Sequence, residues 1–182
     1  MSRSIMWVMA SLLVTSSALA QESNDPFSAP IPAADGVITV NVVEFAALPD
    51  VDGEPARMML LVDEPGTGRL FVNDMRGLLY SVSHDGRTVT RYLELTAPTW
   101  GLSIQARGNE RGFQSFALHP QFNQPDTPGF GKLYTYLDTS DTAPTPDFVS
   151  GGGNDAHDTI LLEWTAENPG AMTYDGGPPR EL

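Results

Sequence analysis

The sequence contains no cysteine among its 182 residues, and it has few basic residues, 10 against 23 acidic ones. Without cysteine the chain forms no disulfides, so hydrophobic packing has to hold its fold together. The formal net charge of -13 at pH 7 repels nucleic acid and anionic membranes, so we expect no nucleic-acid partner. A 3.6-residue apolar repeat is also missing beyond the first 20 residues, which argues against an α-helical fold.

The most continuous apolar run stands at the N-terminus. Arg3 precedes the apolar residues 5–14, and Ala18-Leu19-Ala20 forms a small-x-small cleavage pattern. This arrangement predicts a secretory signal peptide over residues 1–20. The run is shorter than the roughly 20 apolar residues that a membrane span requires, and no later segment approaches that length. We therefore expect an exported protein, secreted or periplasmic, with no membrane span.

The next residues predict a flexible leader and then a folded domain. Residues 21–36 are polar and rich in proline and alanine, as disordered leaders are. Val37–Phe45 is dense in β-branched residues and is predicted to form a strand. With 41% hydrophobic residues, the chain has enough apolar material for one core. We therefore place a single β-domain over residues 37–182.

Short apolar runs separated by turns fill this domain. The first series covers residues 58–62, 69–74, 78–83 and 88–95, and the second covers 113–119, 132–138 and 159–165. A polar connection at 96–111 separates the two series. Asp85-Gly86 is one of the turns, and Asp-Gly between apolar runs is a strong hairpin signal. Two successive antiparallel meanders of about 40 residues match the blades of a β-propeller, although a β-sandwich has similar strand spacing.

One excursion interrupts the second series. Asp141–Asp155 is rich in proline, glycine and aspartate, and it is either a rim loop over a substrate site or a solvated hairpin tip. His157 follows it, between two aspartates. A metal site needs further ligands at a defined spacing, and none accompanies this histidine. We therefore predict no metal ligand here.

The segment Glu110–Phe122, ERGFQSFALHPQF, joins an acidic residue, a glycine, an apolar strand and a His-Pro stop. It resembles the signature of the soluble PQQ-dependent sugar dehydrogenases, the glucose/sorbosone dehydrogenase family. The likeness extends from about Pro55 to Leu182. It includes the hairpin over residues 68–86, GRLFVNDMRGLLYSVSHDG, the strands at 132–136 and 159–164, and the closing Arg180-Glu181-Leu182, which is similar to an Arg-Glu-Leu-Leu lead-in.

The resemblance implies an all-β fold, the opening blades of a six-bladed β-propeller built from antiparallel four-stranded meanders. It also implies an enzyme that oxidises aldose sugars with PQQ and calcium and passes the electrons to an acceptor. In the family, the position of Glu110 lies at the pore-facing edge of a blade beside the quinone. Glu110 is therefore our candidate cofactor-binding residue, and a solvated rim glutamate is the alternative.

The other functional positions of the family have no counterpart in this chain. The family's catalytic histidine follows the Arg-Glu-Leu-Leu lead-in within a His-x-x-Gly segment, and the cationic PQQ-binding residues and calcium ligands belong to later blades. We therefore predict no catalytic and no metal-binding residue here. His119 is predicted to be structural, because Pro120 lacks the N–H that would continue the strand. His84, beside an Asp-Gly turn, is predicted to lie on the surface.

Together these features predict the N-terminal portion of an exported quinoprotein that is inactive as an isolated chain. We expect poor solubility, because Val37–Phe45 would close the propeller ring and is otherwise an unpaired apolar edge. Two alternatives remain open. One is a non-enzymatic propeller that binds a partner at its rim. The other is a carbohydrate-binding β-sandwich in which Trp100 or Trp164 provides a stacking platform.

Overall fold

The fold was analysed in a computed structural model, which describes residues 40–106, 110–139 and 158–182. The chain divides into two units, Met1–Asn41 and Val42–Leu182, and all the strands named below belong to the second. The predicted signal peptide and leader, the Asp141–Asp155 excursion and His157 lie outside the described residues. Their predicted roles therefore stay predictions.

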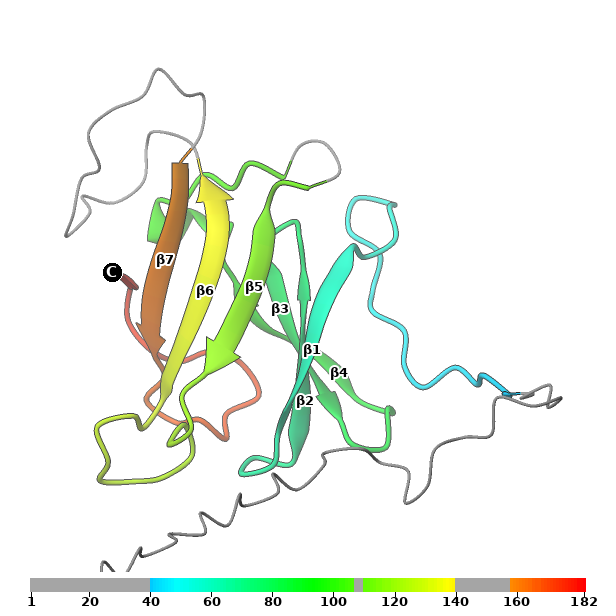
Figure 1. Cartoon of the computed structure of the whole chain (residues 1–182), viewed down its shortest axis with the longest axis horizontal. Coiled ribbons are helices and arrows are strands. Elements are labelled where there is room, and N and C mark those ends of the chain that lie inside the picture. The colour runs from blue at the N-terminus through cyan, green and yellow to red at the C-terminus, as the bar shows by residue number, and fades with distance from the viewer. Residues whose placement is uncertain (1–39, 107–109, 140–157) are drawn as a thin grey trace, which may run out of the picture. The chain divides into compact units, whose positions relative to one another are not determined.

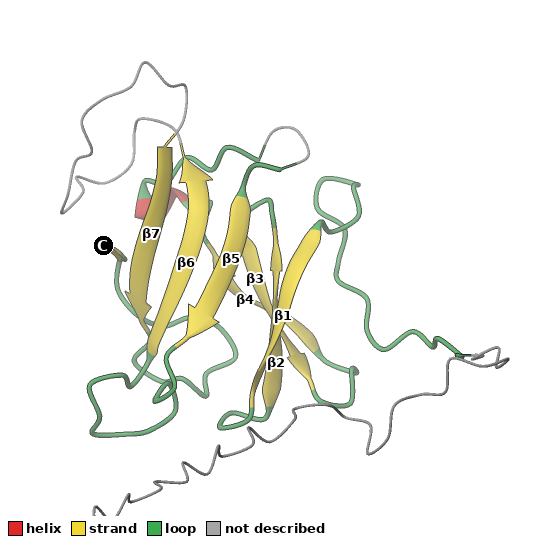
Figure 2. Cartoon of the chain, in the orientation of Figure 1, coloured by secondary structure: helices red, strands yellow, loops and turns green. Residues whose placement is uncertain are grey.

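The described residues form two four-stranded antiparallel meanders, which confirms the all-β prediction (Figures 1 and 2). Sheet 1 has the order β1-β2-β3-β4 and sheet 2 the order β5-β6-β7-β8. The strands are β1 (Met58–Glu64), β2 (Arg69–Asp74), β3 (Leu78–Ser83), β4 (Val89–Glu94), β5 (Phe113–Leu118), β6 (Lys132–Thr139), β7 (Asp158–Thr165) and β8 (Arg180–Glu181). A 3₁₀ turn, η1 (Pro98–Trp100), lies in the connection between the sheets.

The prediction of a strand at Val37–Phe45 is wrong for residues 40–45, which have no regular secondary structure. Val42 and Val43 are 91% and 81% exposed, and Phe45 is 50% exposed. A β-branched run becomes a strand only when a neighbouring strand accepts and donates its backbone hydrogen bonds. None of the described strands pairs with this segment, so its composition alone does not order it.

The two sheets pack face to face around the main core. Each strand alternates between a face toward the other sheet, here called the inner face, and an outer face. The inner faces contribute buried residues from both sheets, including Phe71, Leu79, Phe116, Leu133, Leu162 and Trp164. The backbones approach each other most closely where β5 lies beside β1 and β2. The sheets therefore form a wedge whose narrow side contains the first strand of each meander.

Large aromatic rings fill the wide side of this wedge. Trp164 is fully buried and contacts Trp100 edge to face, with ring centroids 5.3 Å apart. Tyr174 packs against both rings. The suggestion that Trp164 is a carbohydrate platform is therefore wrong, because the ring has no exposed face. Trp100 is partly buried against the same core, so its ring is used for packing too.

Arg69 links sheet 1 to the connection between β7 and β8. Its guanidinium donates to the backbone oxygens of Pro169 and Ala171 and lies 5.0 Å from the Phe71 ring centroid. Burial lowers the pKa of this guanidinium, because desolvation disfavours the charged form. Arg69 therefore connects the two sheets across the wide side of the wedge.

Candidate functional site

The candidate site lies at the end of the sheets where β1 and β5 begin, called the leading end below. Glu110 stands three residues before β5 and is exposed. Its backbone oxygen accepts a hydrogen bond from the Gln114 side chain. Glu110 thus lies at the rim of the fold with its carboxylate in solvent. Its predicted cofactor contact remains a prediction.

The glycine of the ERGF motif has a clear structural reason. Gly112 has φ +134°, and a Cβ built on it would lie 2.2 Å from the Met75 backbone oxygen. That same oxygen accepts the Phe113 N–H at 2.8 Å. The start of β5 therefore rests directly on the β2–β3 turn of sheet 1. Only glycine permits both the backbone conformation and the close approach.

Asp138, in β6, organises the residues around Glu110. Its carboxylate is buried and accepts hydrogen bonds from the Gly112 N–H at 3.1 Å and the Gln114 amide at 2.9 Å. Its other oxygen accepts from the Thr159 hydroxyl at 3.0 Å. The Asp138 carboxylate therefore connects the end of β6 to the start of β5 and the start of β7. The sequence reasoning missed this residue, and its only signal was an aspartate at the end of the apolar run KLYTYLD.

Asn73 plays the matching role in sheet 1. The pairing of β1 with β2 shifts register between Met58 and Leu61, so a β-bulge interrupts the ladder. The fully buried Asn73 side chain accepts the Leu60 N–H at 3.0 Å and donates to the Phe113 oxygen at 2.7 Å. The Asn73 side chain thus provides a hydrogen bond where the bulge interrupts the ladder, and it joins the first strands of both sheets. This residue was also missed from the sequence.

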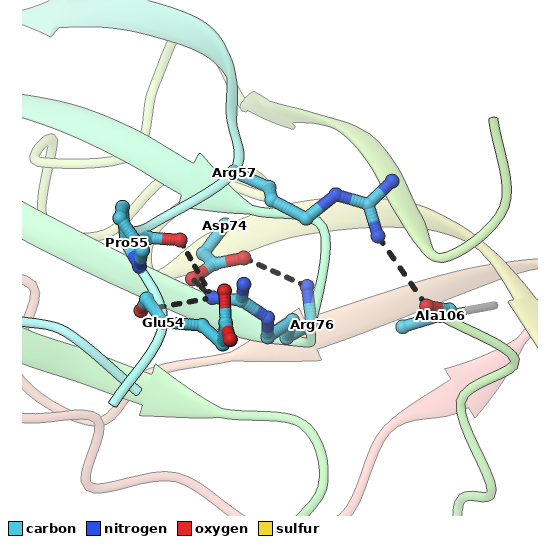
Figure 3. A network of polar contacts seen from close by, with 6 residues as sticks. All are labelled: Glu54, Pro55, Arg57, Asp74, Arg76 and Ala106. Carbon is cyan, nitrogen blue, oxygen red and sulfur yellow. Dashed lines mark hydrogen bonds and ion pairs between the residues drawn. The ribbon is translucent and has the colours of Figure 1, made fainter. Parts of the chain in front are cut away.

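Two arginines at the leading end hold backbone oxygens (Figure 3). Arg76 donates to the Pro55 oxygen at 2.9 Å and lies 3.4 Å from the carboxylate of Asp74, which is fully buried. Arg57 reaches in another direction and donates to the Ala106 oxygen at 3.3 Å. Both cations therefore fasten the loops of the leading end to sheet 1.

This residue set can be compared with what PQQ and calcium need. PQQ carries carboxylates that require cationic partners, and calcium requires several oxygen ligands. At the leading end, Arg57 and Arg76 donate to backbone oxygens and Arg111 is exposed, and no group of three acidic or histidine residues gathers anywhere in the described ranges. The described residues therefore do not form a PQQ or calcium site by themselves.

Two of the three histidines fall within the described residues. His119 uses Nδ1 to accept the Gln121 N–H at 3.0 Å, and its backbone N–H donates to the Lys132 oxygen. This geometry is consistent with the structural role predicted for it. His84 is half exposed, with Nε2 2.7 Å from an Asp63 carboxylate oxygen, so it lies on the surface.

No helix within the described parts of the chain is long and apolar enough to cross a membrane. Comparison with known proteins identifies no matching family model and no matching curated protein. A functional interpretation therefore rests on the ERGF motif, the two meanders and the arrangement of the leading end.

Proposed function

We propose that this chain supplies the first two blades of a six-bladed β-propeller in an exported, PQQ-dependent sugar dehydrogenase. The observation that carries the proposal is the position of β5 beside β1. The starts of these strands are joined through Asn73, and their ends line one cleft, so the two strands run in the same direction. Consecutive blades of a propeller place their innermost strands in this way.

The wedge between the sheets supports the same arrangement. Blades radiate from a central axis, so two neighbours lie close at their first strands and diverge outward. The Trp100–Trp164–Tyr174 cluster fills the diverging side here. In a propeller, every blade is also covered on both faces. The outer face of sheet 2 exposes Tyr136 and Leu161, 46% and 40% accessible, and a third blade would cover them.

Glu110 is the residue of this chain that the proposal places beside the cofactor. It lies at the leading end of an innermost strand, where a carboxylate can hydrogen-bond a quinone oxygen or a sugar hydroxyl. PQQ supplies the oxidising power when it is bound. The residues that hold PQQ and calcium come from other blades in this proposal, as does the catalytic histidine. The partners are an aldose substrate and an electron acceptor, outside the cytoplasm.

The first test is turnover. The purified 182-residue chain, supplied with PQQ, calcium, an aldose and a dye acceptor, should reduce no dye, and any PQQ-dependent reduction contradicts the proposal. The coding sequence after Leu182 is the second test. A His-x-x-Gly segment and basic residues in further blades support the dehydrogenase. A continuation without them favours the non-enzymatic propeller.

The third test addresses Glu110 in the protein that carries such a continuation. Glu110→Ala should weaken PQQ binding or raise the sugar KM by about tenfold, the effect of losing one charge-assisted hydrogen bond. Glu167→Ala is the matched control, because Glu167 is also an exposed glutamate but lies beyond β7. Equal behaviour of the two variants would remove Glu110 from the site.

A further inference from the structure

A second polar site lies at the opposite end of the sheets, where β1 and β5 end. A cleft of about 360 Å³ separates residues 62–66, at the β1–β2 turn, from residues 118–124, which follow β5. We call it the trailing cleft. Its volume lies within the range of small-molecule sites. It shares no residue with the leading end, so its chemistry can be considered separately from Glu110.

The walls of the trailing cleft are held by hydrogen bonds within and between its two segments. The Glu64 carboxylate accepts the N–H groups of Gly66 and Thr67, which fixes the β1–β2 turn. Asn123 donates to the Gly66 oxygen and so connects that turn to the segment after β5. The His119 oxygen accepts the Phe122 N–H at 2.7 Å. The cleft is therefore preformed, which lowers the entropic cost of binding a ligand.

The carboxylates of the trailing cleft disfavour an anionic ligand, and they do not require a cationic one. Asp63 and Glu64 line it, and neither lysine nor arginine is among the described residues that do. Both Glu64 oxygens are satisfied by backbone N–H groups, and an Asp63 oxygen lies 2.7 Å from His84 Nε2. Since these carboxylates already have partners, the cleft suits an uncharged molecule.

The remaining polar groups offer both donors and acceptors. His119 Nδ1 accepts the Gln121 N–H, so the neutral ring carries its proton on Nε2, where it is a donor. The Gln124 amide uses one N–H toward the Pro120 oxygen and retains a second N–H and its oxygen. Pro120 and Leu118 line the cleft with C–H surface. Alternating polar and C–H surface matches a ring that carries several hydroxyls.

We propose that the trailing cleft binds an uncharged, hydroxyl-rich ring of about the size of one hexose. Its hydroxyls would accept from His119 Nε2 and exchange hydrogen bonds with Gln124, while its C–H face lies on Pro120 and Leu118. The site is independent of the proposed PQQ chemistry, because it uses no residue of the leading end.

The test is a titration of the full chain followed by backbone amide chemical shifts. Methyl glucoside is the uncharged probe, glucuronate the anionic probe and glucosamine the cationic probe. Methyl glucoside should shift the amides of the non-proline residues among 62–66 and 118–124 in a saturable way, and it should bind about tenfold more tightly than glucuronate. Binding that does not saturate, shifts confined to other segments, or equal or tighter binding of either charged probe overturns the proposal.

Variants at Gln124 keep the proposal falsifiable, because this side chain is exposed and its replacement should leave the fold intact. Gln124→Leu removes the amide and should weaken binding about tenfold. Gln124→Trp should fill the cleft and abolish binding. Thr173→Leu is the control at an exposed position outside the cleft and should bind like the parent chain. If Gln124→Trp melts normally and still binds methyl glucoside, the trailing cleft is not the site.

Discussion

The outer faces of the two sheets differ although their topologies are the same. On sheet 1, Val72, Leu78, Tyr80 and Val82 form a buried cluster, each 4% exposed or less. Ala46, Leu48 and Val51, from the segment before β1, pack over it. On sheet 2, the equivalent outer face leaves Tyr136 and Leu161 exposed. The outer face of sheet 1 is thus covered over β2 and β3, although residues 58–61 of β1 remain 37% to 62% exposed, whereas the outer face of sheet 2 is open at its middle strands, β6 and β7.

The two meanders are therefore not interchangeable. Their inner faces share one largely apolar core, so each sheet depends on the other to bury it. Residues 46–51 cover the outer face of sheet 1 over β2 and β3. Sheet 2 keeps apolar side chains on a face that nothing among the described residues covers. Apolar residues at such positions are typical of a surface that packs against a further element.

Two leucines on opposite faces of β7 should differ strongly in their contribution to the free energy of unfolding. Leu162→Ala removes a fully buried inner-face side chain and should lower the free energy of unfolding by about 4 kcal/mol. Leu161→Ala, on the outer face of the same strand, should change it by less than about 0.5 kcal/mol. Urea unfolding of both variants measures the contrast. A similar loss at both positions would mean that the outer face of sheet 2 is already covered.

The second prediction breaks the contact between the sheets at the leading end. Gly112→Ala should cost about 3 kcal/mol, because the new Cβ meets the Met75 oxygen and the residue keeps a positive φ. Gly177→Ala is the matched control, since open space surrounds that glycine, and it should be nearly neutral. The same unfolding assay compares them. A neutral Gly112→Ala would show that β5 does not rest on the β2–β3 turn.

The third prediction compares the two outer faces directly. Val82→Ala on sheet 1 should cost about 2 kcal/mol, because two buried methyl groups are lost beneath residues 46–51. Leu161→Ala on sheet 2 removes more carbon atoms but should cost less. Thermal melts of the two variants rank them. The reverse order would contradict the assignment of the covered face to sheet 1.

The strands were predictable from the sequence because their signals are local. Apolar runs of five to eight residues end at turns such as Asp85-Gly86, and the observed β2 and β3 have the predicted bounds. The run at Val37–Phe45 has the same composition, yet residues 40–45 form no strand. Pairing depends on a partner strand, and composition does not report whether one is present.

The polar residues of the leading end were not predictable for a related reason. Asn73 and Asp138 gain their roles from backbone groups about 25 to 40 positions away, and only the packing of the two sheets brings those groups within reach. Trp164 was misjudged likewise, because a tryptophan in a strand gives no sign of which face it occupies until the neighbouring sheet is placed. Glu110 stands three residues before β5, and its cofactor contact stays a prediction.

Tyr92 is buried between the sheets, and its hydroxyl has no hydrogen-bond partner among the described residues. Burial raises its pKa above the ordinary value of 10.0, so the folded state holds the neutral phenol. Its contribution to stability is complete below pH 10 and is lost as the pH rises further, because the unfolded chain releases the proton first. The loss should approach about 1.4 kcal/mol for each pH unit.

Tyr92→Phe should therefore leave stability at pH 7 within about 1 kcal/mol of the parent, since no hydrogen bond is broken. It should also reduce the loss of stability in alkali, which urea unfolding at several pH values measures. Tyr136→Phe is the matched control, because Tyr136 is 46% exposed on the outer face of sheet 2, and it should retain the parent's alkaline loss. If the two variants respond alike, the alkaline sensitivity does not arise between the sheets. If only Tyr92→Phe is protected, the inner face is sealed from solvent while the outer face of sheet 2 remains open.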